Sequence, residues 1–270
     1  MKKLRVIPVL LLRNGWLVQT KQFRRHQNLG NPVAAVKRSS EWAADELIYL
    51  DISRNDLYDL RRDDLWYPNR HDIIHIIEDV SQVACMPITV GGRIRSLDDI
   101  EKRLVAGADK VCVNTKALDE PDFIGRAARE FGTQCIVVSI DVKGSGAEAL
   151  VVTEGGSRTT ARVPEEWARE VERRGAGEIL LNSIDRDGMK TGYDLELLVR
   201  ITDAVQIPVI ACGGAGSWAD FAEAFRRTNV DAVAAANIFH YSDQSVYLAR
   251  QFLFEHGLNV RPPELLGIGT

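Results

Sequence analysis

The sequence predicts an α/β fold, a single (β/α)8 (TIM) barrel with an internal half-barrel duplication. Three observations support this fold. Short β-rich runs alternate with helix-period segments, four of these runs recur in the same order, and 270 residues suit one barrel, which typically has about 250. We therefore expect one domain over residues 1–270, with halves at about 1–130 and 131–262.

The duplication is visible in matched pairs of runs. Residues 46–51 (ELIYLD) resemble 178–183 (EILLNS), and residues 87–92 (PITVGG) resemble 208–214 (PVIACGG). The run 108–114 pairs with 230–237, and the opening run pairs with 136–142. Together these runs predict eight strands, near residues 5–12, 46–52, 87–91, 109–114, 135–141, 177–183, 208–212 and 231–236.

Amphipathic stretches between the runs predict the helices. Residues 164–174 begin at Pro164, a residue favoured in the first helical turn, and are followed by Gly175, which favours a helix end. Residues 217–227 have the same apolar period. No linker or low-complexity segment divides the chain, which favours a single domain.

Composition excludes several classes of protein. A formal charge of −4 gives no indication of a nucleic-acid or membrane partner. The cysteines lack CxxC spacing and three lie in apolar runs, so we expect buried, reduced thiols, no metal and no cofactor; they are Cys85, Cys112, Cys135 and Cys212. Neither a secretory signal nor an apolar run of about 18 residues is present, which predicts a cytoplasmic protein.

Repeated glycine pairs suggest two phosphate sites at the C-terminal ends of the strands. Each pair closes a strand, and an Asn follows the next strand in both halves. A glycine turn alone indicates little, but its repetition favours phosphate, because free N–H groups at a helix start attract anions. The candidates are Gly92, Asn114, Thr115, Asp187, Gly188, Gly213, Gly214, Ala236 and Asn237.

Aspartates at the same strand ends are candidates for acid–base chemistry. Asp141 ends an apolar strand, where an unpartnered carboxyl is more often functional than structural. Asp185 and Asp187 lie in a charged, glycine-rich loop after the sixth strand, where they could bind hydroxyls or transfer protons, or belong to a solvated turn. The repeat counterpart of Asp141 is Leu11, which cannot transfer a proton.

The longest motifs resemble the cyclase subunit (HisF) family of imidazole glycerol phosphate synthase, from about residue 4 to 262. They are residues 5–8 (RVIP), 89–92 (TVGG), 107–111 (GADKV), 173–180 (RRGAGEIL), 183–188 (SIDRDG) and 213–216 (GGAG). The resemblance implies that a partner HisH-like glutaminase releases ammonia, which crosses the barrel to a ribonucleotide with two phosphates. It also implies two catalytic aspartates, of which Asp141 matches one and Leu11 replaces the other.

Further departures from the family pattern surround these positions. Gln19 replaces a lysine, Arg93 a third glycine, Asn182 a threonine and Asn237 a serine. We therefore expect a remodelled substrate pocket.

A second set of charges lies just before the strands, at the other end of the predicted barrel. Taken singly, Arg5, Glu46, Lys110 and Glu178 would be ordinary surface charges. The resemblance implies that these four form a salt-bridged ammonia gate, and that the neighbouring Asp109 faces the glutaminase.

The opening run, with Gly15 and Lys21, is similar to HisF-like proteins of surface-polysaccharide (lipopolysaccharide) gene clusters, associated with glycosyl amidation. An insertion at about 53–70, some 11 residues longer than the family pattern, is rich in aromatic residues and arginines, including Tyr58, Trp66 and Tyr67. Such residues are typical of binding surfaces, although a solvated loop is equally compatible. His71 and His75 favour a helical surface over zinc, because no third ligand accompanies them.

Three functions remain open. The first is an ammonia conduit that serves a separate sugar amidotransferase and has little cyclase activity. The second is a working lyase and cyclase of histidine biosynthesis, relying on Asp141 alone or with Asp187. The third is a regulatory scaffold that binds a phosphorylated small molecule without catalysis.

Overall fold

The computed structural model describes residues 2–54, 57–58, 70–240 and 245–264. Within them, eight parallel strands close into a barrel: β1 (Arg5–Arg13), β4 (Leu47–Asp51), β5 (Ile88–Gly91), β6 (Lys110–Val113), β7 (Ile136–Lys143), β10 (Glu178–Ser183), β11 (Val209–Cys212) and β12 (Ala232–Ala235). The barrel closes because β12 pairs with β1 and β10 pairs with β7. Each strand overlaps its predicted range, so the fold prediction is confirmed.

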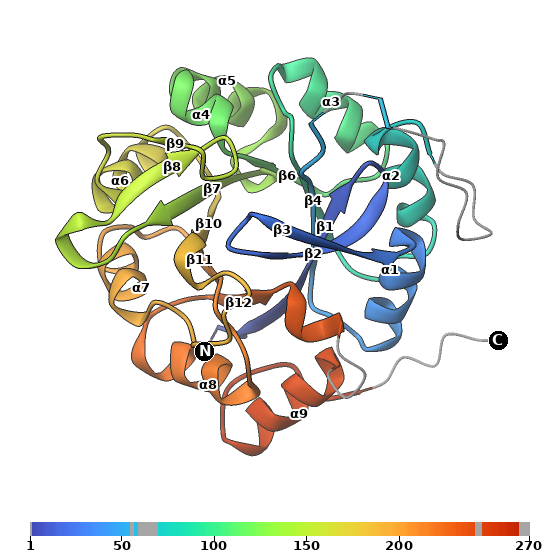
Figure 1. Ribbon diagram of the computed structural model, residues 1–270, viewed down its shortest axis with the longest axis vertical. Helices are drawn as coiled ribbons and strands as arrows, with labels where there is room; N and C mark the ends of the chain where they lie inside the picture. The colour runs from blue at the N-terminus through green and yellow to red at the C-terminus, as the bar shows by residue number, and fades with distance from the viewer. Residues whose placement is uncertain (1, 55–56, 59–69, 241–244, 265–270) are drawn as a thin grey trace.

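Helices surround the strands as an outer ring (Figure 1). They are α1 (Pro32–Glu41), α2 (Ile73–Ser81), α3 (Leu97–Val105), α4 (Thr115–Asp119), α5 (Asp122–Phe131), α6 (Pro164–Arg173), α7 (Leu195–Thr202), α8 (Trp218–Arg227) and α9 (Val246–Glu255). Short 3-10 turns lie at Thr133–Cys135, Gly146–Glu148, Ile184–Arg186 and Asn237–His240. The predicted helix starting at Pro164 is confirmed, and Gly175 follows it with a φ of 100°.

Two antiparallel hairpins extend the barrel strands, and the sequence did not predict them. The first is β2 (Trp16–Lys21) with β3 (Arg25–Gly30), and it crosses the centre of the ring in Figure 1. The second is β8 (Leu150–Thr153) with β9 (Arg158–Thr159). In the strand register Leu11 faces Val18 of the first hairpin, and Asp141 faces Val152 of the second. The repeat positions 11 and 141 therefore each lie beside a hairpin.

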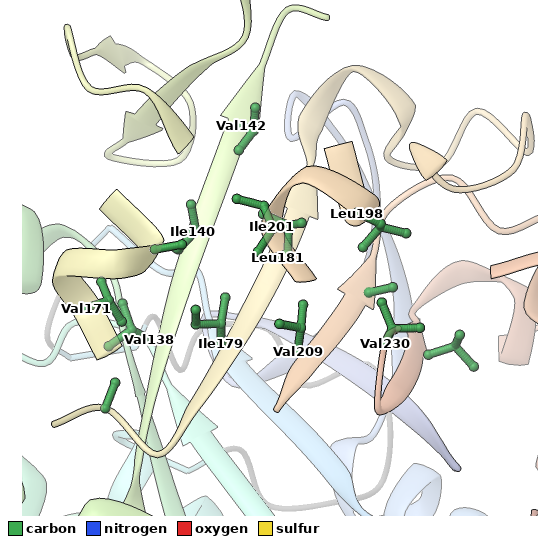
Figure 2. Close-up of a cluster of buried hydrophobic side chains, with 14 of the residues drawn as sticks. Val138, Ile140, Val142, Val171, Ile179, Leu181, Leu198, Ile201, Val209 and Val230 are labelled. Atoms are coloured by element: carbon green, nitrogen blue, oxygen red, sulfur yellow. The ribbon is translucent and has the colours of Figure 1, made fainter. Parts of the chain in front are cut away.

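The core has an inner and an outer apolar layer, because successive strand side chains point to opposite faces. The inner layer fills the barrel with Ile7, Val9, Leu11, Val18, Ile48, Cys112, Val137, Leu180, Ile210, Ala232 and Ala234. In the outer layer, Figure 2 shows Val138, Ile140 and Val142 beside Ile179 and Leu181, with Val171, Leu198 and Ile201 covering them from the helices. Each fully buried aliphatic side chain contributes roughly 1.5–3 kcal/mol. The barrel is therefore a packed core rather than an open pore.

The cysteine expectation is only partly right. Cys112 is buried, Cys135 and Cys212 are partly buried, and Cys85 is exposed, so buried thiols were wrongly expected at Cys85. All four are free thiols. Cys85 is exposed because it lies in the turn that joins α2 to β5 rather than on a strand.

The insertion lies mostly outside the described residues, including Trp66 and Tyr67. Tyr58 is described and buried, and its hydroxyl donates to Asp51 at 2.9 Å. His75 lies on α2 and contacts Asp72, which caps that helix. None of the described helices is long and apolar enough to cross a membrane, and the described residues contain no cluster of three or more metal-ligating side chains.

Candidate active site at the C-terminal ends of the barrel strands

Asp141 lies at the C-terminal end of β7 with its carboxyl in the barrel interior. The side chain is buried, and it accepts hydrogen bonds from Ser139 Oγ at 3.0 Å and from Asn114 Nδ2 at 2.7 Å. Burial raises the pKa of Asp141 to about 6, against the opposing effect of these two bonds, and the charge of Asp187 raises it further. A carboxyl with such a pKa is suited to give and take protons near neutral pH.

Asp187 is the second buried carboxyl at this face, and the first hairpin covers it. Its Oδ2 accepts from Thr20 Oγ1 at 2.9 Å and from the Phe23 N–H at 3.3 Å. Burial raises the pKa of Asp187 above its ordinary value. Asn237 Nδ2 donates to the Thr20 carbonyl at 2.6 Å, so the hairpin is fixed to two of the predicted phosphate-site residues.

Leu11 makes the opposite side of this face apolar. It is buried in the inner layer with Val18 and is packed by Leu50 from the next strand. Gln19, on the first hairpin, donates to Gln27 of the same hairpin at 2.6 Å in an exposed position. Neither residue therefore brings a proton-transfer group to the face from β1.

The glycines predicted to bind phosphate all have positive φ and lie against neighbouring backbone. A Cβ on Gly92, with φ 97°, would lie 2.1 Å from the Asp51 carbonyl oxygen. On Gly214, with φ 108°, it would lie 2.2 Å from the Gly192 carbonyl oxygen. Gly188 and Gly213 have the same restriction. These loops therefore need glycine for close packing. That packing accounts for the glycines without a phosphate, so their role in phosphate binding stays a prediction.

The remaining predicted phosphate residues lie at the same end of the barrel. Thr115 begins α4, and its Oγ1 accepts from Thr153 Oγ1 of the second hairpin at 2.6 Å. Ala236 follows β12 at the edge of the inner layer. Asp185 is not among the buried carboxyls, and its Oδ2 accepts from the Gly144 N–H at 2.7 Å, which gives it a structural role.

A buried polar network beside Gly92 was not predicted. Asp51 accepts from Tyr58 and from the Ser53 N–H, and Arg93 Nη1 lies 3.5 Å from its Oδ2. Arg93 has a φ of 56°, a conformation that non-glycine residues rarely adopt and that is common at functional sites. The sequence feature that could have indicated this network is Arg93, an arginine directly after a glycine pair.

At the N-terminal end, four side chains form a closed ring of charge, which we call the charge ring: Arg5, Glu46, Lys110 and Glu178. Arg5 contacts both glutamates, the contact with Glu178 being 2.5 Å. Lys110 Nζ lies 3.1 Å from Glu46 and 3.0 Å from Glu178. Burial lowers the pKa of Lys110, but the charges of the two glutamates outweigh burial and raise it. Every carboxylate is thus shared by two cations, and passage through the ring requires these contacts to separate.

Asp109 lies beside the charge ring and is exposed. Its Oδ2 accepts from the Ile88 N–H at 2.8 Å. The sequence placed it correctly at the N-terminal end of the barrel, whereas its contact with a glutaminase stays a prediction.

Comparison with known proteins identifies the lineage of this barrel. Residues 5–245 match the family described as histidine biosynthesis protein. The imidazole glycerol phosphate synthase subunit HisF of Halalkalibacterium halodurans is 44% identical over 261 residues, covering 95% of this chain and 98% of that protein. The HisF subunits of Alkaliphilus metalliredigens and Anoxybacillus flavithermus are 40% and 43% identical, each over 95% of this chain and 98% of their own. The chain therefore belongs to the HisF family.

Proposed function

We propose that this protein is the cyclase subunit of an imidazole glycerol phosphate synthase and receives ammonia from a HisH-type glutaminase. The observation that carries the proposal is the buried carboxyl of Asp141, with its pKa of about 6, at the C-terminal face. The charge ring lies at the opposite end of the mostly apolar barrel interior. Ammonia released by a glutaminase would enter the barrel at this ring. Relatives over nearly the whole chain support this function more than sugar amidation, since each is named as this subunit.

The reaction needs proton transfers to close and cleave a ring, and two carboxyls are available for them. Asp141 acts as one acid–base group. Asp187 is the nearest second candidate, because its charge contributes to the raised pKa of Asp141. Asp187 would take the role that Leu11 cannot perform, once the hairpin contacts from Thr20 and Phe23 are released.

The direct test is an ammonium-dependent cyclase assay of the purified protein with the two-phosphate ribonucleotide of the family. Asp141→Asn is expected to lower turnover by about 10²–10⁴-fold, since a general acid–base group contributes that much. Asp187→Asn should lower it to a similar degree, whereas the exposed control Asp203→Asn should not. Absence of measurable turnover in the folded wild-type protein would refute the proposal.

One observation favours a second function, an ammonia conduit for amidation of a surface-polysaccharide sugar by a separate amidotransferase. Leu11 stands where the family resemblance implies an aspartate, and it packs with Val18, which suits passage of ammonia without proton transfer. Complementation of a cyclase-deletion strain separates the two. Growth without histidine would refute the conduit as the main function, and failure to grow with soluble protein present would favour it.

The ammonia gate is tested in the complex with a glutaminase. Arg5→Ala and Lys110→Ala each leave the glutamates of the charge ring with one cation fewer, so the fraction of released ammonia that reaches the synthase should change. Lys102→Ala is a matched control, because Lys102 is an exposed helix lysine that pairs with Asp98, outside the charge ring. Unchanged ammonia transfer in both ring variants would argue against the gate.

A further inference from the structure

Three adjacent strands carry hydrogen-bond acceptors at the C-terminal end of the barrel interior. Asn182 of β10 pairs with Asp141 of β7 in the strand register, and adjacent strands lie about 4.8 Å apart. On the other side of β7, Asn114 follows β6 and donates to Asp141. Because side chains alternate along a strand, Asn182 shares the inward face of Leu180, and Asp141 shares that of Val137. The two amides therefore flank the carboxyl.

The amide oxygens of this group are left without donors. The Oδ1 atoms of Asn114 and Asn182 are buried, and neither accepts a hydrogen bond from any residue that the structure describes. Asn182 is 7% exposed, so a donor that reaches its amide oxygen has to lie inside the barrel. Buried polar atoms without partners are rare, because their desolvation is not repaid. Two such atoms, on residues that flank one carboxyl in the fold, point to a donor that is not part of the chain.

The chemistry of the group restricts that donor. The carboxylate form of Asp141 and the two amide oxygens can only accept hydrogen bonds, which disfavours an anion beside these atoms. The thiol of Cys212 lies on the next strand, where burial raises its pKa to about 12 and keeps it neutral. Below the group, the side chains of the inner layer are mostly apolar as far as the charge ring. A small molecule with several N–H donors fits these acceptors, and ammonia or ammonium is the smallest.

We infer that Asn182, together with Asn114 and Asp141, forms a holding site for ammonia where it leaves the barrel interior. The inference rests on the proposed function, in which ammonia crosses the barrel. Asn182 is then a positioning residue: its amide oxygen holds the incoming nitrogen beside Asp141, before the nitrogen meets the substrate.

The first test needs no reaction. Side-chain amide signals of Asn114 and Asn182 are followed by ¹⁵N–¹H NMR in the wild-type protein while ammonium chloride is added, with sodium chloride and potassium chloride as controls. Both signals should shift and saturate with ammonium only. Shifts without saturation would overturn the inference. An equal response to potassium would also overturn it, since potassium has a similar size and charge but donates no hydrogen bond.

The second test uses external ammonium in the cyclase assay. Asn182→Leu should raise the KM for ammonium by about three- to tenfold, the effect of losing one neutral hydrogen bond, with the substrate KM unchanged. Asn182→Thr keeps a hydroxyl acceptor and should raise the KM for ammonium less. The control Asn229→Leu, at an exposed position, should leave the KM for ammonium unchanged. A change confined to the substrate KM would assign Asn182 to the substrate and overturn the inference. Should the wild-type protein lack cyclase activity, the proposed function fails, and the NMR titration alone decides the holding site.

Discussion

Replacing Asp141 by asparagine should stabilise the protein while it removes activity. An asparagine can keep both hydrogen bonds, by accepting from Asn114 Nδ2 and donating to Ser139 Oγ. Only the charge is lost. Because burial raises the pKa of Asp141 from 3.8 to about 6, the charged form costs roughly 3 kcal/mol of folding free energy at neutral pH.

The sign of this effect sets its pH dependence. Folded Asp141 holds its proton more tightly than the unfolded chain does, so its ionisation lowers stability as the pH rises from about 4 to above 6. The gain from Asp141→Asn should therefore be about 3 kcal/mol at pH 8 and fall to about 1 kcal/mol at pH 4.5. At pH 8 the melting temperature should rise by roughly 5–10 °C.

Calorimetric melting at pH 8, 6 and 4.5 checks this expectation, with the exposed Asp203→Asn as the control. A gain for Asp141→Asn that did not depend on pH would show that packing rather than charge causes it. A lower melting temperature at pH 8 would refute the reasoning, because the carboxylate would then be stabilised by its site.

Three other changes test separate features of the face. Leu11→Asp should destabilise the protein by roughly 2–5 kcal/mol in chemical unfolding, because it buries an unpaired charge, and it should not by itself raise cyclase turnover above wild type. Gly92→Ala should lower the melting temperature strongly, because φ is 97° and the Cβ would lie 2.1 Å from a backbone oxygen. A melting temperature within 2 °C of wild type, which corresponds to roughly one kcal/mol at most, would contradict this expectation. Thr20→Val removes a donor to Asp187 and should speed proteolysis of the first hairpin in a time course, while equal cleavage would mean that this bond does not hold it.

The barrel strands could be predicted because their signal is local. Each is a short apolar run ended by a turn residue, and the repeat confirmed the order. The outer strands of the two hairpins, β3 and β9, gave no such signal. Residues 25–30 (RHQNLG) are mostly polar, and β9 is two exposed residues, Arg158 and Thr159. β3 and β9 form because they pair with β2 and β8, which in turn pair with the ends of β1 and β7 in the barrel.

The sequence predicted at which end of the barrel each residue of the candidate site lies. It did not predict which of these residues contact one another. Residues at strand ends were assigned to one face, and the charge ring was assigned to the other, because barrel topology dictates both. That Thr20 would hold Asp187 depends on a bond between residues 167 positions apart, which no local pattern encodes. The unpartnered oxygens of Asn182 and Asn114 are likewise invisible until the neighbouring side chains are in place.

The difference between the two halves of the barrel explains the electrostatics of the face. In one half, Leu11, Val18 and Leu50 supply no charge and no hydrogen bond to the interior. In the other, Asp141 accepts from two neutral donors, Asn114 and Ser139, and has no cation among its described hydrogen-bond partners. Its pKa rises for this reason, since burial is not offset by an opposite charge. A second aspartate at position 11 would face Asp141 across the mostly apolar inner layer, and its charge would raise the pKa of Asp141 further. Restoring the repeat would therefore change the chemistry of Asp141 as well as that of position 11.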